Sequence, residues 1–364
     1  MAKYFVENDI STAKTIHSDF YSDPKVFESS KEKIFAEGLH FVGDISLLPE
    51  RGSAFPFTLL EGFLDEPVVI IRDKDNLIKC LSNVCTHRGN LLITEPCKMS
   101  QIRCKYHGRT FNQNGEMVFM PEFKEVLNFP CEDDHLISFP IFQWGTLLFV
   151  SLNNNIEPSA YFGDMMARMS FFPVDQLVRR DDLSKEYEVN ANWALYCENY
   201  LEGFHIPFVH AGLSEVLDFG DYETELYYPY SSLQLGVAKS KEGVFDLPED
   251  AVDYGRNIAA YYFWVFPNMM FNFYPWGLSL NIVQPLSPDR TKVSFITYMY
   301  DESKYGQGAG GDLDKVEKED EEIVQNVQKG VKSRFYTHGR YSVKREKGTH
   351  HFHTLLSRFI NEVI

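Results

Sequence analysis

The stretch 83–108, NVCTHRGNLLITEPCKMSQIRCKYHG, contains two pairs of a thiol and an imidazole. Cys85 and His87 are separated by one residue, Cys104 and His107 by two, and sixteen residues lie between His87 and Cys104. Zinc fingers usually place two Cys in one turn and two His in the other. Here each loop supplies one residue of each kind, an order that suits two iron atoms clamped between two loops.

Each loop would give its Cys to one iron and its His to the other, which describes a Rieske-type [2Fe-2S] cluster. In this cluster type two His replace two Cys on one iron and raise the reduction potential. We therefore predict a [2Fe-2S] cluster bound by Cys85, His87, Cys104 and His107. A structural zinc site is the alternative metal site, and four unrelated loop residues are disfavoured by two such tight spacings.

The composition limits the kinds of partner. The chain has 364 residues, of which 44% are hydrophobic, enough for two domains with a sizeable core. Its net charge of −17 argues against binding to nucleic acid or anionic lipid, because both require a basic surface. Six cysteines are too few for a disulfide scaffold, and the N-terminal residues show no apolar signal-peptide segment, so we expect a cytoplasmic protein.

One uncharged segment is long enough to form a transmembrane helix, residues 257–288. Pro, Gly and Asn interrupt it repeatedly, and a lipid-exposed helix tolerates such a series poorly. Short aromatic runs between these residues are typical of buried strands joined by turns. We therefore predict strands here and no membrane partner.

The pattern of the chain indicates three parts. Residues 1–39 are expected to be helical, because apolar residues recur there at helical spacing up to Gly38. Residues 40–155 contain short β-type runs with turns, and both Cys-His loops lie in this part. Residues 156–364 mix helices with aromatic-rich strands, and we expect them to form a second domain.

A second metal site is indicated by NWALYCENYLEGFHIPFVHAG, residues 192–212. Helical spacing places Glu202 and His205 opposite an apolar stripe. On a continuous helix, His205 and His210 would point about 140° apart, because they are separated by five positions. Pro207 can break the helix and turn His210 towards His205, which would form half of a facial Fe(II) site.

A facial Fe(II) site also needs a carboxylate. The segment DLDKVEKEDEEIVQNVQKGVKSRF, residues 312–335, has apolar residues that define one helix face, and Asp320 lies within that face. A carboxylate there is costly unless it is paired or bound to metal, so we predict Asp320 as the third ligand. A capping or salt-bridged Asp is the alternative. The neighbouring acids are expected to form a solvated face: Glu317, Glu319, Glu321 and Glu322.

The motifs CTHRG and CKYHG, in a chain of this length, resemble those of the Rieske non-haem iron oxygenases, the ring-hydroxylating oxygenase alpha-subunit family. In the Rieske proteins of respiratory complexes, two extra Cys form a disulfide beside the cluster. Asn90 and Tyr106 stand at those places here, which points to the oxygenase type. The family also carries two His with four residues between them and a later Asp on a helix, which His205, His210 and Asp320 match.

The resemblance gives Glu202 a role. In the family, a carboxylate three residues before the first His bridges to a Rieske His of a neighbouring subunit. Most members have Asp at this place, so Glu202 departs from the common pattern. This Glu and the C-terminal run 328–356 resemble the subgroup that acts on quaternary ammonium compounds such as choline, glycine betaine and carnitine.

The resemblance further implies an α+β fold with two domains. A Rieske β-sandwich-type [2Fe-2S] domain would span residues 40–155, and a helix-grip (START/Bet v 1-like) catalytic domain with the mononuclear iron would span 156–364, with residues 1–39 packed on it. The family implies a homotrimer, because the two metals of one chain are too far apart for fast electron transfer. A separate NAD(P)H-dependent reductase of the flavin or ferredoxin type would supply electrons, since no Gly-rich nucleotide motif follows a strand here.

We therefore predict a Rieske monooxygenase or dioxygenase that uses O₂ to hydroxylate or demethylate a small organic substrate, with a quaternary ammonium compound favoured. The aromatic-rich segment 261–276 can supply a cage for a trimethylammonium group, although most of its rings are expected to pack in the core. One alternative is an aromatic-ring hydroxylating dioxygenase, which would need a similar apolar pocket. The other is a Rieske electron carrier without oxygen chemistry.

Overall fold

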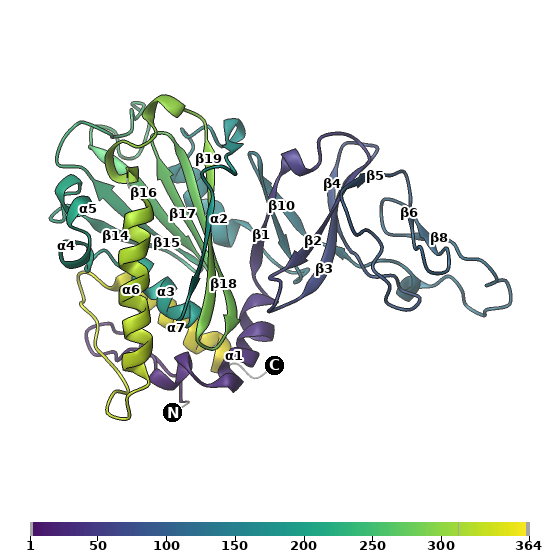
Figure 1. The fold of residues 1–364 in the computed structure, drawn as a ribbon, viewed down its shortest axis with the longest axis horizontal. Helices are drawn as coiled ribbons and strands as arrows, with labels where there is room; N and C mark the ends of the chain where they lie inside the picture. The colour runs from purple at the N-terminus through teal and green to yellow at the C-terminus, as the bar shows by residue number, and fades with distance from the viewer. Residues whose placement is uncertain (1–2, 312, 362–364) are drawn as a thin grey trace. The chain divides into compact units, whose positions relative to one another are not determined.

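The computed structural model describes residues 3–311 and 313–361, which form two compact units (Figure 1). The smaller unit is Ala36–Ile156, and the larger unit combines the described parts of 1–35 and 157–364. The division falls at 35/36 and 156/157, whereas the sequence pattern predicts 39/40 and 155/156. Residues 1–2, 312 and 362–364 of the predicted N-terminal and C-terminal parts lie outside the described residues.

The smaller unit contains three antiparallel sheets of short strands. Their strand orders are β1 (Leu39–Asp44), β11 (Leu147–Ser151), β10 (Ile141–Trp144); then β5 (Cys97–Lys98), β2 (Ser53–Leu59), β3 (Glu66–Arg72), β4 (Ile78–Ser82), β9 (Ser138–Phe139); and β6 (Ile102–Arg103), β7 (Thr110–Phe111), β8 (Met117–Phe119). Short 3₁₀ helices lie at Ile45–Leu47 and Glu132–Asp134.

Strand β3 lies between two layers of core. Val68 and Ile70 pack into one cluster of buried residues, and Val69 and Ile71 pack into the other. A strand covered on both faces reads as a continuous apolar run rather than an alternating one, which explains the sequence EPVVIIR. The second cluster also contains Cys85, so the first Cys-His loop packs against the face of β3 that carries Val69 and Ile71.

The larger unit is built on one antiparallel sheet of eight strands. Its order is β12 (Val178–Arg179), β19 (Arg290–Met299), β18 (Gly277–Ser287), β17 (Met269–Tyr274), β16 (Ile258–Val265), β15 (Ser231–Val237), β14 (Glu223–Tyr227), with β13 (Lys185–Val189) also paired with β19. In the described part of 157–364, the α-helices are α2 (Ser159–Arg168), α3 (Trp193–Tyr200), α4 (Ile206–Val209), α5 (Ala211–Val216), α6 (Leu313–Val331) and α7 (Lys347–Asn361). Short 3₁₀ helices lie at Val174–Gln176, Glu302–Lys304 and Gly308–Gly310.

Alternation along the strands sorts the aromatic side chains between the two faces of this sheet. On one face Trp264 of β16 packs against Phe352 of α7, with ring centroids 5.2 Å apart. On the other face Phe271 of β17 packs against Phe162 of α2, at 6.0 Å. Helix α6 lies over the first of these faces (Figure 1), and the space beneath it holds the candidate site described below.

The uncharged segment 257–288 forms β16, β17 and β18, as its interrupted aromatic pattern predicts. Among the described residues, no helix has both the length and the apolar character that crossing a membrane would require. The long apolar composition of this segment therefore reflects strands in the centre of a covered sheet.

The N-terminal segment is helical over a shorter range than the sequence predicts. Within it, a 3₁₀ helix covers Ser18–Tyr21, α1 covers Pro24–Ser30, and a π-helix covers Lys31–Phe35. The described residues before Ser18 form turns and irregular segments, and Lys14 forms an isolated bridge with Arg340. The expectation of a helical segment over residues 1–39 is therefore wrong for its first half, and β1 already begins at Leu39.

Candidate metal centres

The two Cys-His loops of the smaller unit each contain the same type of backbone turn. The amide of Gly89 donates to the carbonyl of Cys85 (2.9 Å), and the amide of Gly108 donates to the carbonyl of Cys104 (3.1 Å). Gly89 and Gly108 have φ angles of 69° and 76°, a left-handed conformation that glycine adopts without steric cost. The glycine that ends each motif therefore allows each loop to turn back on its cysteine.

Both thiols of these loops lie in the core and face each other. Cys85 and Cys104 are buried, and their side chains form a hydrogen bond. Burial acts to raise the pKa of Cys104, but the backbone amides of Tyr106 and His107 and the side chain of Asn90 donate to its sulfur and bring the pKa below its ordinary value. Donors directed at a sulfur stabilise the thiolate, which is the form that binds metals.

The imidazoles of the same loops lie on the outer side. The ring centroids of His87 and His107 are 4.7 Å apart, with an angle of 76° between the planes. His107 is exposed and His87 is half-buried. Tyr106 covers the His107 ring, with a centroid distance of 3.7 Å. The loops therefore present thiols to the core and imidazoles to the surface.

A buried arginine braces the first loop, and the sequence motifs do not point to it. Arg109 donates to the hydroxyl of Thr86 (2.7 Å) and to the carboxylate of Asp134 (3.2 Å). Its guanidinium lies over the ring of Phe129, 5.3 Å from the centroid. The one sequence signal for this residue is its place directly after the CKYHG motif.

The donor set of the two loops fits a binuclear cluster better than a single ion. A tetrahedral zinc site would need all four ligand atoms around one point. Within the described chain, the one group of three or more His, Cys, Asp or Glu residues whose ligand atoms lie within 4.8 Å of one another is in the larger unit. In the smaller unit the thiols form one pair and the imidazoles another, as a [2Fe-2S] cluster with Cys₂ and His₂ irons requires.

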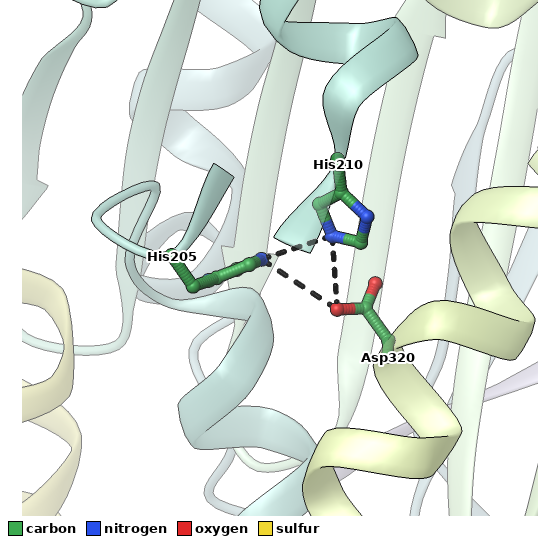
Figure 2. Close-up of side chains that lie close together, drawn as sticks. All are labelled: His205, His210 and Asp320. Carbon is green, nitrogen blue, oxygen red and sulfur yellow. Dashed lines mark hydrogen bonds and ion pairs between the residues drawn. The ribbon is translucent and has the colours of Figure 1, made fainter. Parts of the chain in front are cut away.

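In the larger unit, three side chains converge on one point (Figure 2). The Nε2 atoms of His205 and His210 are 3.2 Å apart. Oδ1 of Asp320 lies 3.1 Å from Nε2 of His210 and 3.5 Å from Nε2 of His205. Ligand atoms about 2.1 Å from a metal and on one face of an octahedron are about 3 Å apart, so this triad has the spacing of a facial divalent-metal site.

The chain reaches the triad through a break between two helices. Helix α3 ends at Tyr200, His205 precedes α4, and His210 follows it. The break therefore lies before Pro207, which occupies the first turn of α4, where its missing N–H costs nothing. The expectation that His205 continues the first helix and that Pro207 breaks it is wrong.

Gly203 is the residue that makes this break possible. A Cβ at position 203 would lie 2.3 Å from Cε1 of Tyr222, a distance that real Cβ atoms essentially never show. The ring of Tyr222 is buried and belongs to the wall of the same site. The loop between α3 and α4 can therefore pass this ring only as glycine.

Helix α6 carries Asp320 on the face that it turns towards the site. The same face carries Glu317, Val324 and Gln328, which are all buried. Position 317 precedes position 320 by nearly one turn, so the two side chains point in similar directions. The expectation that Glu317 belongs to a solvated face is therefore wrong, whereas Ile323, which the apolar pattern places inside, is exposed.

A carboxylate contacts the Nδ1 atom of each imidazole of the triad. Oε1 of Glu202 is 2.7 Å from Nδ1 of His205, and Oε2 of Glu319 is 2.8 Å from Nδ1 of His210. Such an acceptor fixes the ring and leaves Nε2 free to bind metal. Glu319 is therefore engaged in the site, contrary to the expectation that it is solvated. Burial acts to lower the pKa of His210, but the nearby carboxylates raise it.

An amide holds the third side chain of the triad. Nδ2 of Asn199 donates to Oδ1 of Asp320 (2.6 Å). The sequence motifs do not indicate Asn199, because it lies on α3 six residues before His205 and forms no recognisable spacing with it. Only the packing of α3 beside α6 brings this amide to the carboxylate.

The triad forms part of the wall of a pocket of about 770 Å³, a volume that includes its opening to solvent. The sheet contributes the opposite wall through Gln234, Tyr262, Asn272, Tyr274, Ser279, Asn281 and Phe295. Of the aromatic side chains in segment 261–276, only Tyr262 and Tyr274 line this pocket, because alternation along the strands directs the others elsewhere. Their ring centroids are 6.0 Å apart and their planes are at 78°.

Comparison with known families covers most of the chain. Residues 178–362 match the ring hydroxylating alpha subunit (catalytic domain), and residues 49–130 match the Rieske [2Fe-2S] domain. The chain is 30% identical to the chloroplastic choline monooxygenase of Arabidopsis thaliana, over 95% of this chain and 83% of that protein. It is 27% identical to the carnitine monooxygenase oxygenase subunit of Escherichia coli (strain K12), over 96% and 95%.

Solved structures share the fold. A quaternary ammonium Rieske monooxygenase superposes with a TM-score of 0.75 at 24% identity, over 98% of this chain and 100% of that one. A naphthalene 1,2-dioxygenase from Rhodococcus sp. superposes with a TM-score of 0.69 at 20% identity, over 95% and 93%. At these identities the two structures show a common α+β architecture, and they do not distinguish between substrates.

The contact at Gly203 gives a direct test of how the loop is built. Gly203→Ala should displace Tyr222 or the loop and lower the melting temperature by several degrees, because such overpacking costs about 1–3 kcal/mol. Gly212→Ala on α5 is the control, since a Cβ there meets nothing within 4 Å. Thermal unfolding followed by circular dichroism measures both. Equal melting temperatures for the two variants would contradict the close approach.

Proposed function

The chain belongs to the Rieske non-haem iron oxygenases of the ring-hydroxylating alpha-subunit family, as its two motifs predict, and we propose that it hydroxylates or demethylates a small quaternary ammonium compound. It is an oxidoreductase with a Rieske [2Fe-2S] cluster, a mononuclear iron and O₂ as co-substrate. The predicted α+β fold is likewise confirmed. The observation that carries the substrate proposal is the position of the metal-ligand triad in the wall of a tyrosine-lined pocket.

We assign the cluster to Cys85, His87, Cys104 and His107, and the mononuclear iron to His205, His210 and Asp320. When bound, the cluster supplies single electrons and the mononuclear Fe(II) supplies the positions at which O₂ is activated. Support for this assignment comes from the pairing of thiols and imidazoles in the smaller unit and from the facial spacing of the triad.

The remaining side chains of the larger unit orient these groups and receive the substrate. Glu202 and Glu319 hold the Nδ1 protons of the two imidazoles, so both Nε2 atoms point to the metal position. Tyr262 and Tyr274 line the pocket with rings nearly at right angles, an arrangement suited to a trimethylammonium group. The pocket also argues against a pure electron carrier, which would need no substrate space.

The proposal includes a homotrimer, in which Glu202 of one subunit reaches a cluster imidazole of the next, and a separate NAD(P)H-dependent reductase of the flavin or ferredoxin type. Exposed aromatic residues next to both partners of this contact support it. Phe208, beside the His205 loop, is 81% exposed, and Tyr106, beside His107, is 59% exposed. Aromatic side chains are enriched at subunit interfaces relative to the rest of the protein surface. We further propose a cytoplasmic location.

A substrate panel tests the proposed activity. Choline, glycine betaine or carnitine should stimulate O₂ uptake, with a surrogate reductase and NADH, more than benzoate or biphenyl does. The reason is that the tyrosine pair favours a cation over a neutral ring. Preference for a neutral arene, which a ring-hydroxylating dioxygenase would show, would contradict the substrate class and leave the family unchanged.

The ligand assignment is tested by two neighbouring carboxylates of α6. Asp320→Ala should remove about one iron atom per chain and abolish turnover, while the cluster stays reducible, because a facial ligand is lost. Glu319→Ala should weaken iron binding only about 10–100-fold, because it removes the acceptor behind His210. Iron analysis with EPR of the reduced protein distinguishes them. The assignment is wrong if Glu319→Ala empties the site and Asp320→Ala does not.

The role of Glu202 between subunits is tested by single turnover of pre-reduced enzyme with substrate and O₂ at saturating Fe(II). Glu202→Ala should leave the cluster reducible and slow its reoxidation severely. The reason is that the variant lacks the carboxylate that we propose to lie between His205 and a cluster imidazole of the next subunit. Glu202→Asp should keep substantial activity, since most of the family uses Asp. Glu215→Ala, an exposed carboxylate on α5, is the control. Unchanged reoxidation in Glu202→Ala would place the electron path elsewhere.

A further inference from the structure

Glu317 is a buried carboxylate with one oxygen that lacks a partner. Its side chain lies on the inward face of α6, lines the pocket and is 3% exposed. The hydroxyl of Tyr196 donates to Oε2 (2.5 Å), whereas Oε1 is buried with no hydrogen-bond partner. Such a group costs folding free energy unless a donor or a cation approaches it. Glu317 therefore contributes to the pocket wall and also carries a buried oxygen that no described donor satisfies.

Among the described residues that line the pocket, His205 and His210 are the only basic side chains, and both are paired with other carboxylates. The described lining residues include the carboxylates of Glu202, Glu317 and Asp320 and no Lys or Arg. Glu202 is bound to His205, and Asp320 belongs to the triad. Burial raises the pKa of Glu317 to about 8, although the bond from Tyr196 acts in the opposite direction. A cation beside this carboxylate would restore its ionised form.

We propose that Glu317 is the counter-ion for the onium group of the substrate, and that the substrate is a monocation that carries no carboxylate. This inference rests on the proposed function and narrows its substrate class. A betaine would bring its own carboxylate into a pocket that already holds Glu202 and Glu317, with no Lys or Arg among the described lining residues to bind it. A neutral arene would leave Glu317 unpaired.

The position of Glu317 also accounts for where oxidation would occur. Glu317 and Asp320 are three residues apart on the same helix face, a spacing that places their Cβ atoms about 5–6 Å apart. An onium group held by Glu317 therefore has its methyl groups or its adjacent carbon next to the triad. Tyr262 and Tyr274 complete the enclosure from the sheet. The counter-ion thus orients the substrate as well as selecting its charge.

Calorimetric titration of the iron-loaded enzyme tests the inference with three probes of similar size. These are choline, its neutral carbon analogue 3,3-dimethylbutan-1-ol, and the zwitterion glycine betaine. In the wild type, choline should bind at least about tenfold more tightly than either of the others. Glu317→Gln should weaken choline at least about tenfold and leave 3,3-dimethylbutan-1-ol unchanged. Glu322→Gln, the same change at an exposed position of α6, should alter none of the three.

Thermal unfolding separates this role from a structural one. Glu317→Gln should keep or raise the melting temperature, because it removes a buried group that can ionise without a cation. A lower melting temperature together with weaker binding of all three probes would mean that Glu317 maintains the fold, and would overturn the inference. Unchanged choline affinity with lost turnover would overturn it as well, since Glu317 would then serve proton delivery.

The probes also separate this inference from the proposed function. If glycine betaine binds the wild type as tightly as choline does, the absence of a carboxylate is refuted and the proposed oxygenase activity on quaternary ammonium compounds stands. If none of the cations binds and a neutral arene stimulates O₂ uptake, the proposed substrate class and the counter-ion role both fail. Selective loss of choline affinity in Glu317→Gln supports both.

Discussion

The Nε2 atoms of His205 and His210 lie 3.2 Å apart because a carboxylate binds the Nδ1 atom of each ring and fixes its orientation. Glu202 lies in the loop after α3, and Glu319 lies on α6, so the two supports come from segments that only the fold brings together. With Nδ1 engaged, Nε2 of each ring points inward to Asp320. The spacing of the whole triad therefore depends on the packing of α6 over the loop between α3 and α4, which Gly203 permits.

The same packing creates a pocket in which negative charge exceeds positive charge. Helix α6 brings Asp320 to the metal position and Glu317 to the substrate space from one face. A divalent metal would compensate the negative charge of Asp320. The charge of the buried Glu317 carboxylate would then have to be compensated by the substrate. Tyr196 holds that carboxylate in place without neutralising it. In the function that we propose, α6 thus combines metal binding through Asp320 with selection of a cationic substrate through Glu317.

The ligands that we propose for both metal sites are predicted from the sequence, whereas the residues that hold these ligands in place are not. Cys85, His87, Cys104 and His107 are recognisable because their spacing is local, and the turns at Gly89 and Gly108 are local too. The aromatic strands of 257–288 are also predictable, because Pro, Gly and Asn mark their ends. Arg109 and Asn199 could not be predicted from the sequence. Each donates a hydrogen bond to a residue that is distant along the chain, Arg109 to Thr86 and Asn199 to Asp320.

Helix α6 shows why the prediction of its faces was incomplete. Its buried face includes Glu317 and Gln328, so hydrophobicity alone does not identify that face. The neighbours determine it instead, because Gln328 accepts from the backbone of Asn192 (2.7 Å) and Glu317 accepts from Tyr196. A polar side chain can be buried where the fold provides a hydrogen-bond partner, and the sequence alone does not identify that partner.

The central claim is that one chain holds two separate iron centres through two independent ligand sets. Iron analysis combined with EPR of the reduced protein tests it most directly, in the wild type, Cys104→Ser and His210→Ala. The account predicts about three iron atoms per chain and a Rieske signal in the wild type. Cys104→Ser should lose about two iron atoms and the signal, and His210→Ala about one atom with the signal kept. A Rieske signal that persists in Cys104→Ser, or zinc in place of iron, would contradict the account.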